Sequence, residues 1–465
     1  MTTTPTTPTD AQAPVDLLIT HAMVATVDAH DTVLHDHAVA VAGGIIREVG
    51  PSAELEARHP AAPRLDATGQ LLTPGFVNLH VHSALAVTRG LGDDLGGAPV
   101  YRRDVPQGVL LSPTDTATLS LLGGLQALAM GSTTLVENYL HARSNIEALA
   151  TTGGRVVVSE RVHDADLFTV REATYRFDEA DGRRRLDDNV ALIEEWHGAY
   201  DGRVTAMVGP HGPDTVSAPL LERCLEVAEA YDVGVFIHLA QTAGEGAHVA
   251  ARTGLGSVQL LRKLGLLGPR LLAGHCAFID EADAEALLES GTAICSLPTV
   301  NAKNGWMAPL NPLRRAGAVV GLGTDHMVHD MVTAMRMAVC VNRITDGGPG
   351  AISAAEALRM ATIEGARALG RADEIGSVEV GKRADLLLVE TRGLHMTPLL
   401  DPVANLVYAG QSADVRTVLV DGQVVVRDGA PQLVDAEAAR VEAQRLTQHL
   451  WERTAGWVAP AGFRC

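Results

Sequence analysis

Strand-like apolar runs broken by turn signals occupy both ends of the chain. Near the N-terminus these runs cover residues 17–24, 32–41 and 45–49. Near the other end they cover residues 385–389, 415–420 and 424–426. Gly43–Gly44 and Asp421–Gly422 separate neighbouring runs in the manner of two-residue hairpin turns. We therefore predict a small β-sandwich domain formed from both chain ends, residues 15–70 plus 375–430.

The section between them alternates strand-like runs with amphipathic segments of helix length. The runs cover residues 132–137, 155–159, 203–208, 234–238, 271–274, 293–297 and 319–323. This alternation is typical of a parallel sheet, and the number of units predicts an α/β fold of the (β/α)8 TIM-barrel type over residues 71–374. Residues 1–14 are expected to be a disordered leader, and residues 431–465 a C-terminal helix and tail.

Polar residues stand where the predicted barrel strands end, which is where such barrels carry their active sites. His80 and His82 close the first apolar run, and the side-chain period of two puts both on the same side of a strand. Further strands end at His211, at His238, at His275 and at the pair Asp325–His326. One such histidine is more often a packed core residue than a ligand. Their recurrence at strand ends predicts a metal centre.

Composition narrows the class of protein. The chain has 465 residues, a net charge of −19 and 46% hydrophobic residues. The charge argues against nucleic acid or an anionic membrane as a partner, and no apolar run has the length of about 18 residues that a membrane span needs. Five cysteines without a CxxC pair favour reduced thiols, and we expect a cytoplasmic protein. We also expect a homodimer or homotetramer, with the C-terminal helix as an oligomer contact.

The strand-end motifs, in this order, resemble those of the amidohydrolase superfamily, in the branch of cytosine, guanine and S-adenosylhomocysteine deaminases and triazine hydrolases. The matching segments are 74–82, 131–134, His238, 274–275, 323–325 and 376–385. The resemblance implies one divalent metal ion per subunit, held by His80, His82, His238 and Asp325, with His275 as a further ligand or an oxyanion stabiliser. Binuclear relatives use a carboxylated lysine on the fourth strand, and residues 203–210 contain no lysine. Zinc or cobalt is expected, and iron or manganese would also suit this ligand set.

The expected reaction is hydrolysis. A divalent ion can lower the pKa of its bound water to about 7. Asp325 would accept the proton and pass it to the leaving group, and His275 would polarise a carbonyl or stabilise an oxyanion. Family deaminases have a proton-shuttling glutamate three residues after the third histidine, where this chain has Gln241. An amide cannot shuttle a proton near neutral pH, and Glu245 is expected on a solvated helix face.

Gln241 therefore favours direct attack on the carbonyl carbon of a small apolar amide, urea, carbamate or thiocarbamate, with cleavage of a C–N or C–S bond. The chain is similar here to the small branch of molinate and phenylurea hydrolases. The alternatives are a deaminase or dechlorinase of a nitrogen heterocycle (purine, pyrimidine or triazine) and a non-catalytic scaffold with this fold. The residues expected to contact substrate are Gln241, His211, Trp306, Asn304, Arg89 and His329.

Overall fold

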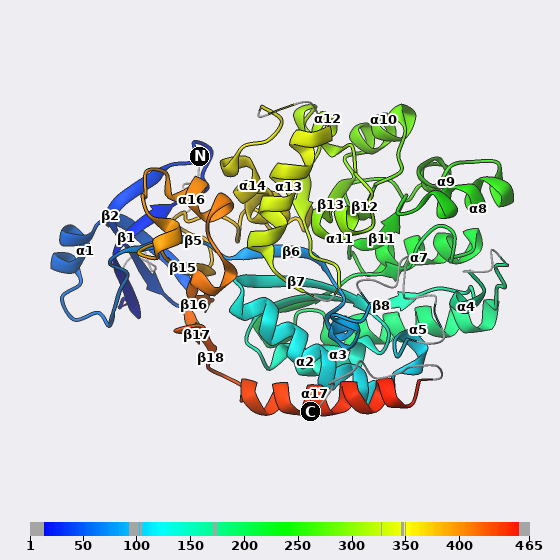
Figure 1. Ribbon diagram of the computed structural model, residues 1–465, viewed down its shortest axis with the longest axis horizontal. Coiled ribbons are helices and arrows are strands. Elements are labelled where there is room, and N and C mark those ends of the chain that lie inside the picture. Colours follow the sequence, from blue (N-terminus) through cyan, green and yellow to red (C-terminus); the bar gives the residue numbers. More distant parts are fainter. Residues whose placement is uncertain are drawn as a thin grey trace, which may run out of the picture.

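The computed structural model describes residues 14–92, 102, 105–170, 174–326, 328–345, 348 and 350–454 (Figure 1). Most of the predicted leader and the last residues of the predicted tail lie outside these ranges. Within them the chain forms a (β/α)8 barrel and a smaller β domain beside it, which confirms the fold class expected from the sequence.

The barrel strands are parallel and each is followed by helical segments. In chain order they are β6 (Phe76–Val81), β7 (Ser132–Tyr139), β8 (Arg155–Val162), β9 (Val204–Ala206) with β10 (Gly209–Pro210), β11 (Val235–Leu239), β12 (Leu271–His275), β13 (Ala293–Ser296) and β14 (Val320–Leu322). Two ladders, β6 to β10 and β11 to β14, make up the wall. Parallel bridges join them, Val208 to Val235 on one side and Val81 to Asp325 on the other. The second bridge brings Asp325 beside the end of β6.

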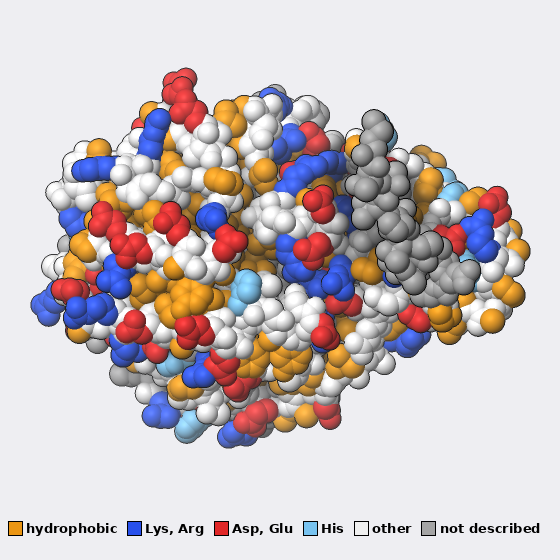
Figure 2. Space-filling view, turned by 180° about the vertical axis from the view of Figure 1, so that it is seen from behind, with side chains coloured by type: hydrophobic (Ala, Val, Ile, Leu, Met, Phe, Trp, Pro, Cys, Tyr) orange, Lys and Arg blue, Asp and Glu red, His pale blue; other side chains and the backbone are white. Residues whose placement is uncertain are grey.

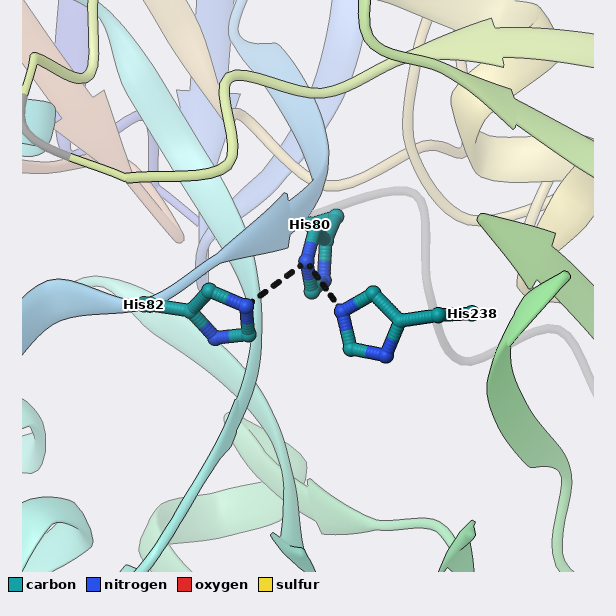
Figure 3. A group of neighbouring side chains, drawn as sticks. All are labelled: His80, His82 and His238. Carbon is teal, nitrogen blue, oxygen red and sulfur yellow. Dashed lines mark hydrogen bonds between the residues drawn. The ribbon is translucent and has the colours of Figure 1, made fainter. Parts of the chain in front are cut away.

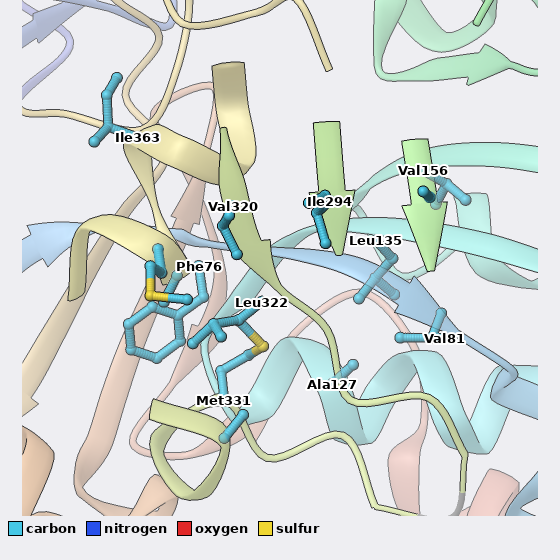
Figure 4. Close-up of a cluster of buried hydrophobic side chains, with 14 of the residues drawn as sticks. Phe76, Val81, Ala127, Leu135, Val156, Ile294, Val320, Leu322, Met331 and Ile363 are labelled. Atoms are coloured by element: carbon cyan, nitrogen blue, oxygen red, sulfur yellow. The ribbon is translucent and has the colours of Figure 1, made fainter. Parts of the chain in front are cut away.

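Helices cover the outside of the barrel. They are α2 (Pro113–Ala129), α3 (Ala142–Ala150), α4 (Leu167–Val170), α5 (Glu179–Trp196), α6 (Ala199–Gly202), α7 (Ala218–Ala230), α8 (Ala243–Thr253), α9 (Ser257–Lys263), α10 (Glu281–Ser290), α11 (Pro298–Lys303), α12 (Leu310–Arg315), α13 (Met331–Thr345), α14 (Ala354–Ala361) and α15 (Ile363–Ala368). Apolar side chains between strands and helices form the largest core cluster, part of which is drawn in Figure 4. A second cluster, which includes Leu79, Val136 and Phe236, fills the barrel interior beneath the histidines.

The β domain contains segments from both ends of the chain. Its strands are β1 (Leu17–Ala25), β2 (Val33–Ala42), β3 (Ile45–Pro51), β4 (Arg64–Asp66), β5 (Gln70–Pro74), β15 (Leu386–Glu390), β16 (Val415–Val420), β17 (Gln423–Arg427) and β18 (Ala430–Pro431), with α1 (Ser52–Arg58) at one edge. Antiparallel pairing of β5 with β15 connects the two halves, so that all nine strands belong to one hydrogen-bonded sheet. Because β5 runs directly into β6, the β domain is anchored at the start of the first barrel strand.

Two further helices follow the barrel. The first, α16 (Pro402–Tyr408), lies against α13 and α14, and the second, α17 (Ala436–Glu452), runs along α2 at the lower edge of Figure 1. One end of α17 is fixed by Trp451, which is buried and donates its indole N–H to the carbonyl of Val87 at 2.7 Å. The C-terminal helix expected from the sequence therefore packs on the barrel. No helix in the described part of the chain combines the length and apolar character needed to cross a membrane.

Candidate metal centre

Three buried histidines meet at the mouth of the barrel (Figure 3). His80 and His82 come from the end of β6 and His238 from β11. The Nε2 atom of His80 lies 3.1 Å from Nε2 of His82 and 3.1 Å from Nε2 of His238. Suitable donor atoms of the three side chains all lie within 4.8 Å of one another. A register shift in the β6–β7 pairing lies between Asn78 and Val81, where a bulge can redirect the histidines.

The hydrogen bonds of the other ring nitrogens fix two of the imidazoles in one tautomer. His82 donates its Nδ1–H to the carbonyl of Asn138 at 2.6 Å, and His238 donates its Nδ1–H to the carbonyl of His211 at 2.7 Å. Each neutral ring then presents a lone pair on Nε2. Burial lowers the pKa of all three histidines, that of His80 to about 3, so that they are neutral at physiological pH.

This donor set fits a divalent metal ion. Both neighbouring Nε2 atoms carry a lone pair. If Nε2 of His80 carried a proton, that single N–H group could donate a hydrogen bond to only one of them. A metal ion can accept all three lone pairs at once. Neutral imidazoles whose second nitrogen donates to a carbonyl are the usual form of histidine ligands. The residues present therefore fit zinc or a similar ion, and the identity of the ion remains a prediction.

Asp325 and His275 complete the group. Oδ1 of Asp325 lies 3.5 Å from Nε2 of His82 and 3.8 Å from Nε2 of His80, and its Oδ2 lies 3.8 Å from Nε2 of His275. Burial by itself would raise the pKa of Asp325, but the imidazole of His326, whose Nδ1 lies 3.0 Å from Oδ1 of Asp325, holds it well below the usual range. The carboxylate is therefore charged at neutral pH. Its roles as ligand and proton acceptor, and the role of His275, remain predictions from the sequence.

Local backbone features explain how Asp325 reaches the histidines. The segment after β14 approaches β6 closely, since a Cβ atom on Gly323 would lie only 2.9 Å from the backbone nitrogen of His80. Asn78 and Thr324 form two hydrogen bonds, of 2.8 and 3.1 Å, which tie the two segments together. Asp325 then adopts a left-handed φ of 62°. A non-glycine residue in this region is uncommon, and such strain is concentrated at functional sites.

Two buried residues at the site were missed by the sequence analysis. Asn301, in α11, accepts the Nδ1–H of His275 on its Oδ1 at 2.9 Å. Arg161, at the end of β8, has Nη2 3.1 Å from both ring nitrogens of His82. The sequence did contain a pattern that could have identified Arg161. Ser159, Arg161 and His163 occupy alternate positions after an apolar run, with the same two-residue spacing as His80 and His82. Asn301 lies in a helix with no such pattern.

The expected substrate contacts lie at different distances from this centre. The ring centroid of His211 is 5.1 Å from that of His238, and His329 is fully buried with Nδ1 3.2 Å from Oγ1 of Thr324. Gln241 is half-buried just after β11.

The other three candidates lie further out or in surface loops. Trp306 is half-buried with its ring 5.7 Å from that of Phe278. Asn304 and Arg89 are both exposed. The side chain of Asn304 donates to the carbonyl of Val300, and that of Arg89 donates to Gln126. All six remain predictions as substrate contacts.

The expectation for Glu245 was wrong. Its side chain is buried rather than on a solvated face, and its two oxygens accept the backbone N–H groups of Ala240 and Gln241 at 2.8 and 2.7 Å. The first turn of α8 folds back on the end of β11, so that this carboxylate is used to hold the turn. It cannot take the place of a shuttle glutamate at position 241 without breaking these bonds.

Comparisons with known proteins agree with this architecture. A model of the amidohydrolase family matches residues 71–425, and one of a bacterial imidazolonepropionase-like composite domain matches residues 38–62. A 5-methylthioadenosine/S-adenosylhomocysteine deaminase of Pelotomaculum thermopropionicum is 34% identical, with 94% of this chain and 99% of the relative covered. A 5'-deoxyadenosine deaminase of Methanosarcina mazei is 30% identical, with the same two coverages of 94% and 99%.

Solved structures give the same picture. An adenosine deaminase from Xanthomonas campestris with bound zinc has a TM-score of 0.86 and 29% identity, over 94% of this chain and 99% of the other. Atrazine chlorohydrolase from Arthrobacter aurescens, complexed with zinc, has a TM-score of 0.81 at 23% identity, over 93% of this chain and 100% of the other. At that identity the second likeness shows the fold alone.

Proposed function

Because the chain belongs to the amidohydrolase family and is a metal-dependent hydrolase acting on C–N bonds, we propose that it deaminates a purine nucleoside, releasing ammonia from the exocyclic amino group. The substrate class is that of adenosine analogues altered at the 5' position. The observation that carries the proposal is 34% identity, across 94% of the chain, to a 5-methylthioadenosine/S-adenosylhomocysteine deaminase. This identity supports an amino-substituted heterocycle as substrate over the carbonyl substrate that the sequence alone favoured.

The side chains of the centre suit such a reaction. His80, His82 and His238 would hold the metal ion, which would make water a nucleophile by lowering its pKa. Asp325 is charged and would accept the proton of that water and return it to the leaving amine. The neutral His275 has its Nδ1–H bonded to Asn301, so its Nε2 accepts a hydrogen bond rather than donating one. It therefore suits orienting water better than stabilising an oxyanion.

A second candidate rests on Gln241. Deamination of a purine needs a proton at the ring nitrogen next to the attacked carbon, and an amide side chain cannot supply it. Glu245 is committed to the backbone of the same turn. Hydrolysis of an amide, urea, carbamate or thiocarbamate has no such requirement. This single residue keeps carbonyl hydrolysis as the alternative function.

A substrate panel separates the two. Zinc-loaded and cobalt-loaded protein would be given adenosine, 5'-deoxyadenosine, 5-methylthioadenosine, S-adenosylhomocysteine and a set of ureas, carbamates and thiocarbamates. Ammonia release from the nucleosides, abolished by a chelator, is the expected result. Turnover of the carbonyl compounds without any ammonia from the nucleosides would reject the deaminase in favour of the second candidate.

The variant Gln241→Glu sharpens the comparison. A positioned acid typically contributes about 10²–10⁴-fold to a proton-transfer step. We expect Gln241→Glu to raise kcat for nucleoside deamination by about 10-fold or more. Activity on a carbonyl substrate should change little. A fall in deaminase activity in this variant would show that Gln241 itself is adapted to the substrate.

A further inference from the structure

A tyrosine joins the loop after β8 to two neighbouring segments at the barrel mouth. Tyr175 stacks on the ring of His248 in α8, with the ring centroids 3.3 Å apart and the ring planes at 18°. Its hydroxyl group donates to Oδ2 of Asp214 at 3.2 Å, in the turn that follows β10. The segments after β8, β10 and β11 therefore meet at one half-buried side chain.

An arginine in α8 ties the same segments together at a second point. The guanidinium carbon of Arg252 lies 4.9 Å from the ring centre of Phe177. Its Nη2 atom donates to the carbonyl of Pro213 at 2.6 Å and to that of Val216 at 3.3 Å. Ring stacking and cation–π contacts each stabilise such an arrangement beyond the area that they bury. The loop after β8 is thus held twice, at Tyr175 and at Phe177.

The turns held in this way carry two of the expected substrate contacts. His211 is three residues before Asp214, and Gln241 is four residues before Glu245. The carboxyl group of Glu245 accepts the backbone N–H of Gln241 at 2.7 Å and interacts with the charge of Asp214. Contacts made by the loop after β8 therefore act on the backbone of both turns.

The loop after β8 also forms one wall of a cavity beside the centre. The cavity has a volume of about 330 Å³, and its lining includes His163, Arg176, Phe177 and Asp178. The ring centroid of His163 lies 6.1 Å from that of His211, which places the cavity on the side of the centre nearest β8. Part of a substrate that extends from the metal-binding histidines in this direction would meet the loop.

We propose that Tyr175 is a positioning residue, which fixes the loop after β8 against the turns of His211 and Gln241 and keeps these parts in the arrangement that binds substrate. The proposal deepens the proposed function and rests on it for the substrate. Tyr175 acts through the backbone of neighbouring segments, so its loss should change KM rather than kcat.

Hydrogen–deuterium exchange, measured by mass spectrometry on the protein without substrate, tests this arrangement directly. The peptides of interest cover residues 211–216 and 240–249. Tyr175→Phe removes only the hydroxyl group, so exchange should rise in the first peptide alone. Tyr175→Leu also removes the ring and should raise exchange in both peptides by about 3- to 10-fold. Tyr231→Phe is the matched control, because it removes a hydroxyl group that donates to Glu194 at an exposed site.

Kinetics with 5-methylthioadenosine give the second readout. We expect KM to rise by about 3- to 10-fold in Tyr175→Leu and by less in Tyr175→Phe, with kcat and metal content unchanged. The Tyr231→Phe control should match the wild type in both experiments.

Unchanged exchange in both peptides of the Tyr175 variants would overturn the proposal, as would a lower kcat at an unchanged KM. Faster exchange throughout the molecule would also overturn it, by showing a general loss of stability. Absence of ammonia from every nucleoside would reject the proposed function instead. The exchange pattern would then still decide whether Tyr175 positions the two turns.

Discussion

Single hydrogen bonds decide the chemical form of the residues at this centre. His82 and His238 each have one backbone carbonyl at Nδ1, and His275 has the side chain of Asn301. The backbone acceptors cannot be removed by substitution, but Asn301 can. Partners of this kind typically alter metal affinity or activity by 10- to 100-fold when they are changed.

Substitution of Asn301 tests its role as a positioning residue. Without the acceptor at Nδ1, the ring of His275 can rotate or take the other tautomer. Asn301→Ala should lower kcat by about 10- to 100-fold with KM and metal content little changed. Asn301→Asp keeps an acceptor oxygen and should retain more activity than the alanine variant. Equal kcat in Asn301→Ala and wild type would show that the bond does not matter for turnover.

Asp325 is the second residue whose role can be isolated. Asp325→Asn keeps the size of the side chain but removes its charge and its ability to accept a proton. We expect a fall in kcat of about 10²-fold or more, since general acid–base groups contribute on this scale. Metal analysis of the same protein separates loss of the proton acceptor from loss of a ligand. Wild-type activity in this variant would contradict the assignment.

At the scale of elements, the turn between β11 and α8 is held by a carboxyl group. Glu245 accepts two backbone N–H groups there, and Asp214 lies close enough to interact with it. Burial raises the pKa of Glu245 to about 8, and the charge of Asp214 adds to the effect. The folded protein thus holds this proton more tightly than the unfolded chain, whose ordinary value is 4.5. The contribution of Glu245 to stability is complete below the unfolded pKa and falls as the pH rises through about 8.

The pH dependence of unfolding tests this arrangement. Between about pH 6 and pH 7.5, Glu245 should contribute a decline on the order of 1 kcal/mol per pH unit to the free energy of unfolding. Glu245→Gln should remove this part of the slope, and Glu222→Gln, at an exposed position of α7, is the control. Urea unfolding at several pH values measures it. Parallel curves for wild type and Glu245→Gln would show that the carboxyl group is not protonated in the fold.

The predictive power of the sequence differed between kinds of element. Strands ending in polar residues were recognisable, because alternation along a strand is a local pattern and parallel strands bring their carboxyl ends together. His80, His82 and His238 were found in this way. Glu245 was misplaced because nothing local indicates that the first turn of α8 folds back on β11. Asn301 was missed for a similar reason, since its position against His275 depends on the path of the loop after β13.

At the scale of the molecule, a buried ion-pair network joins the barrel to the β domain. Arg155, at the start of β8, donates from Nε and Nη2 to the carboxylate of Asp385 at 2.6 and 3.0 Å and also pairs with Asp421. Asp385 directly precedes β15, at the start of the predicted run 385–389, and Asp421 directly follows β16, after the predicted run 415–420. The network therefore fixes the segments after residue 384 against the barrel. The charged side chains on the surface in Figure 2 differ from this buried network, because acidic and basic groups there are exposed and interspersed with apolar patches.

Removal of one partner from this network should be costly. Arg155 and Asp385 are 1% and 3% exposed, and breaking a buried pair leaves an uncompensated charge. Arg155→Met should lower the free energy of unfolding by about 3–5 kcal/mol, measured by urea unfolding. The exposed pair of Arg143 with Glu195 provides the control, since Arg143→Met should cost less than about 1 kcal/mol. Similar small losses in both variants would mean that the network adds little stability.

The central claim is that His80, His82 and His238 hold a single catalytic metal ion. Crystals of the zinc-loaded protein, measured at the zinc absorption edge, test it most directly. The account predicts one anomalous peak in the barrel, about 2.0–2.1 Å from Nε2 of each of the three histidines. Absence of a peak among these nitrogens, or a peak elsewhere in the molecule, would contradict it.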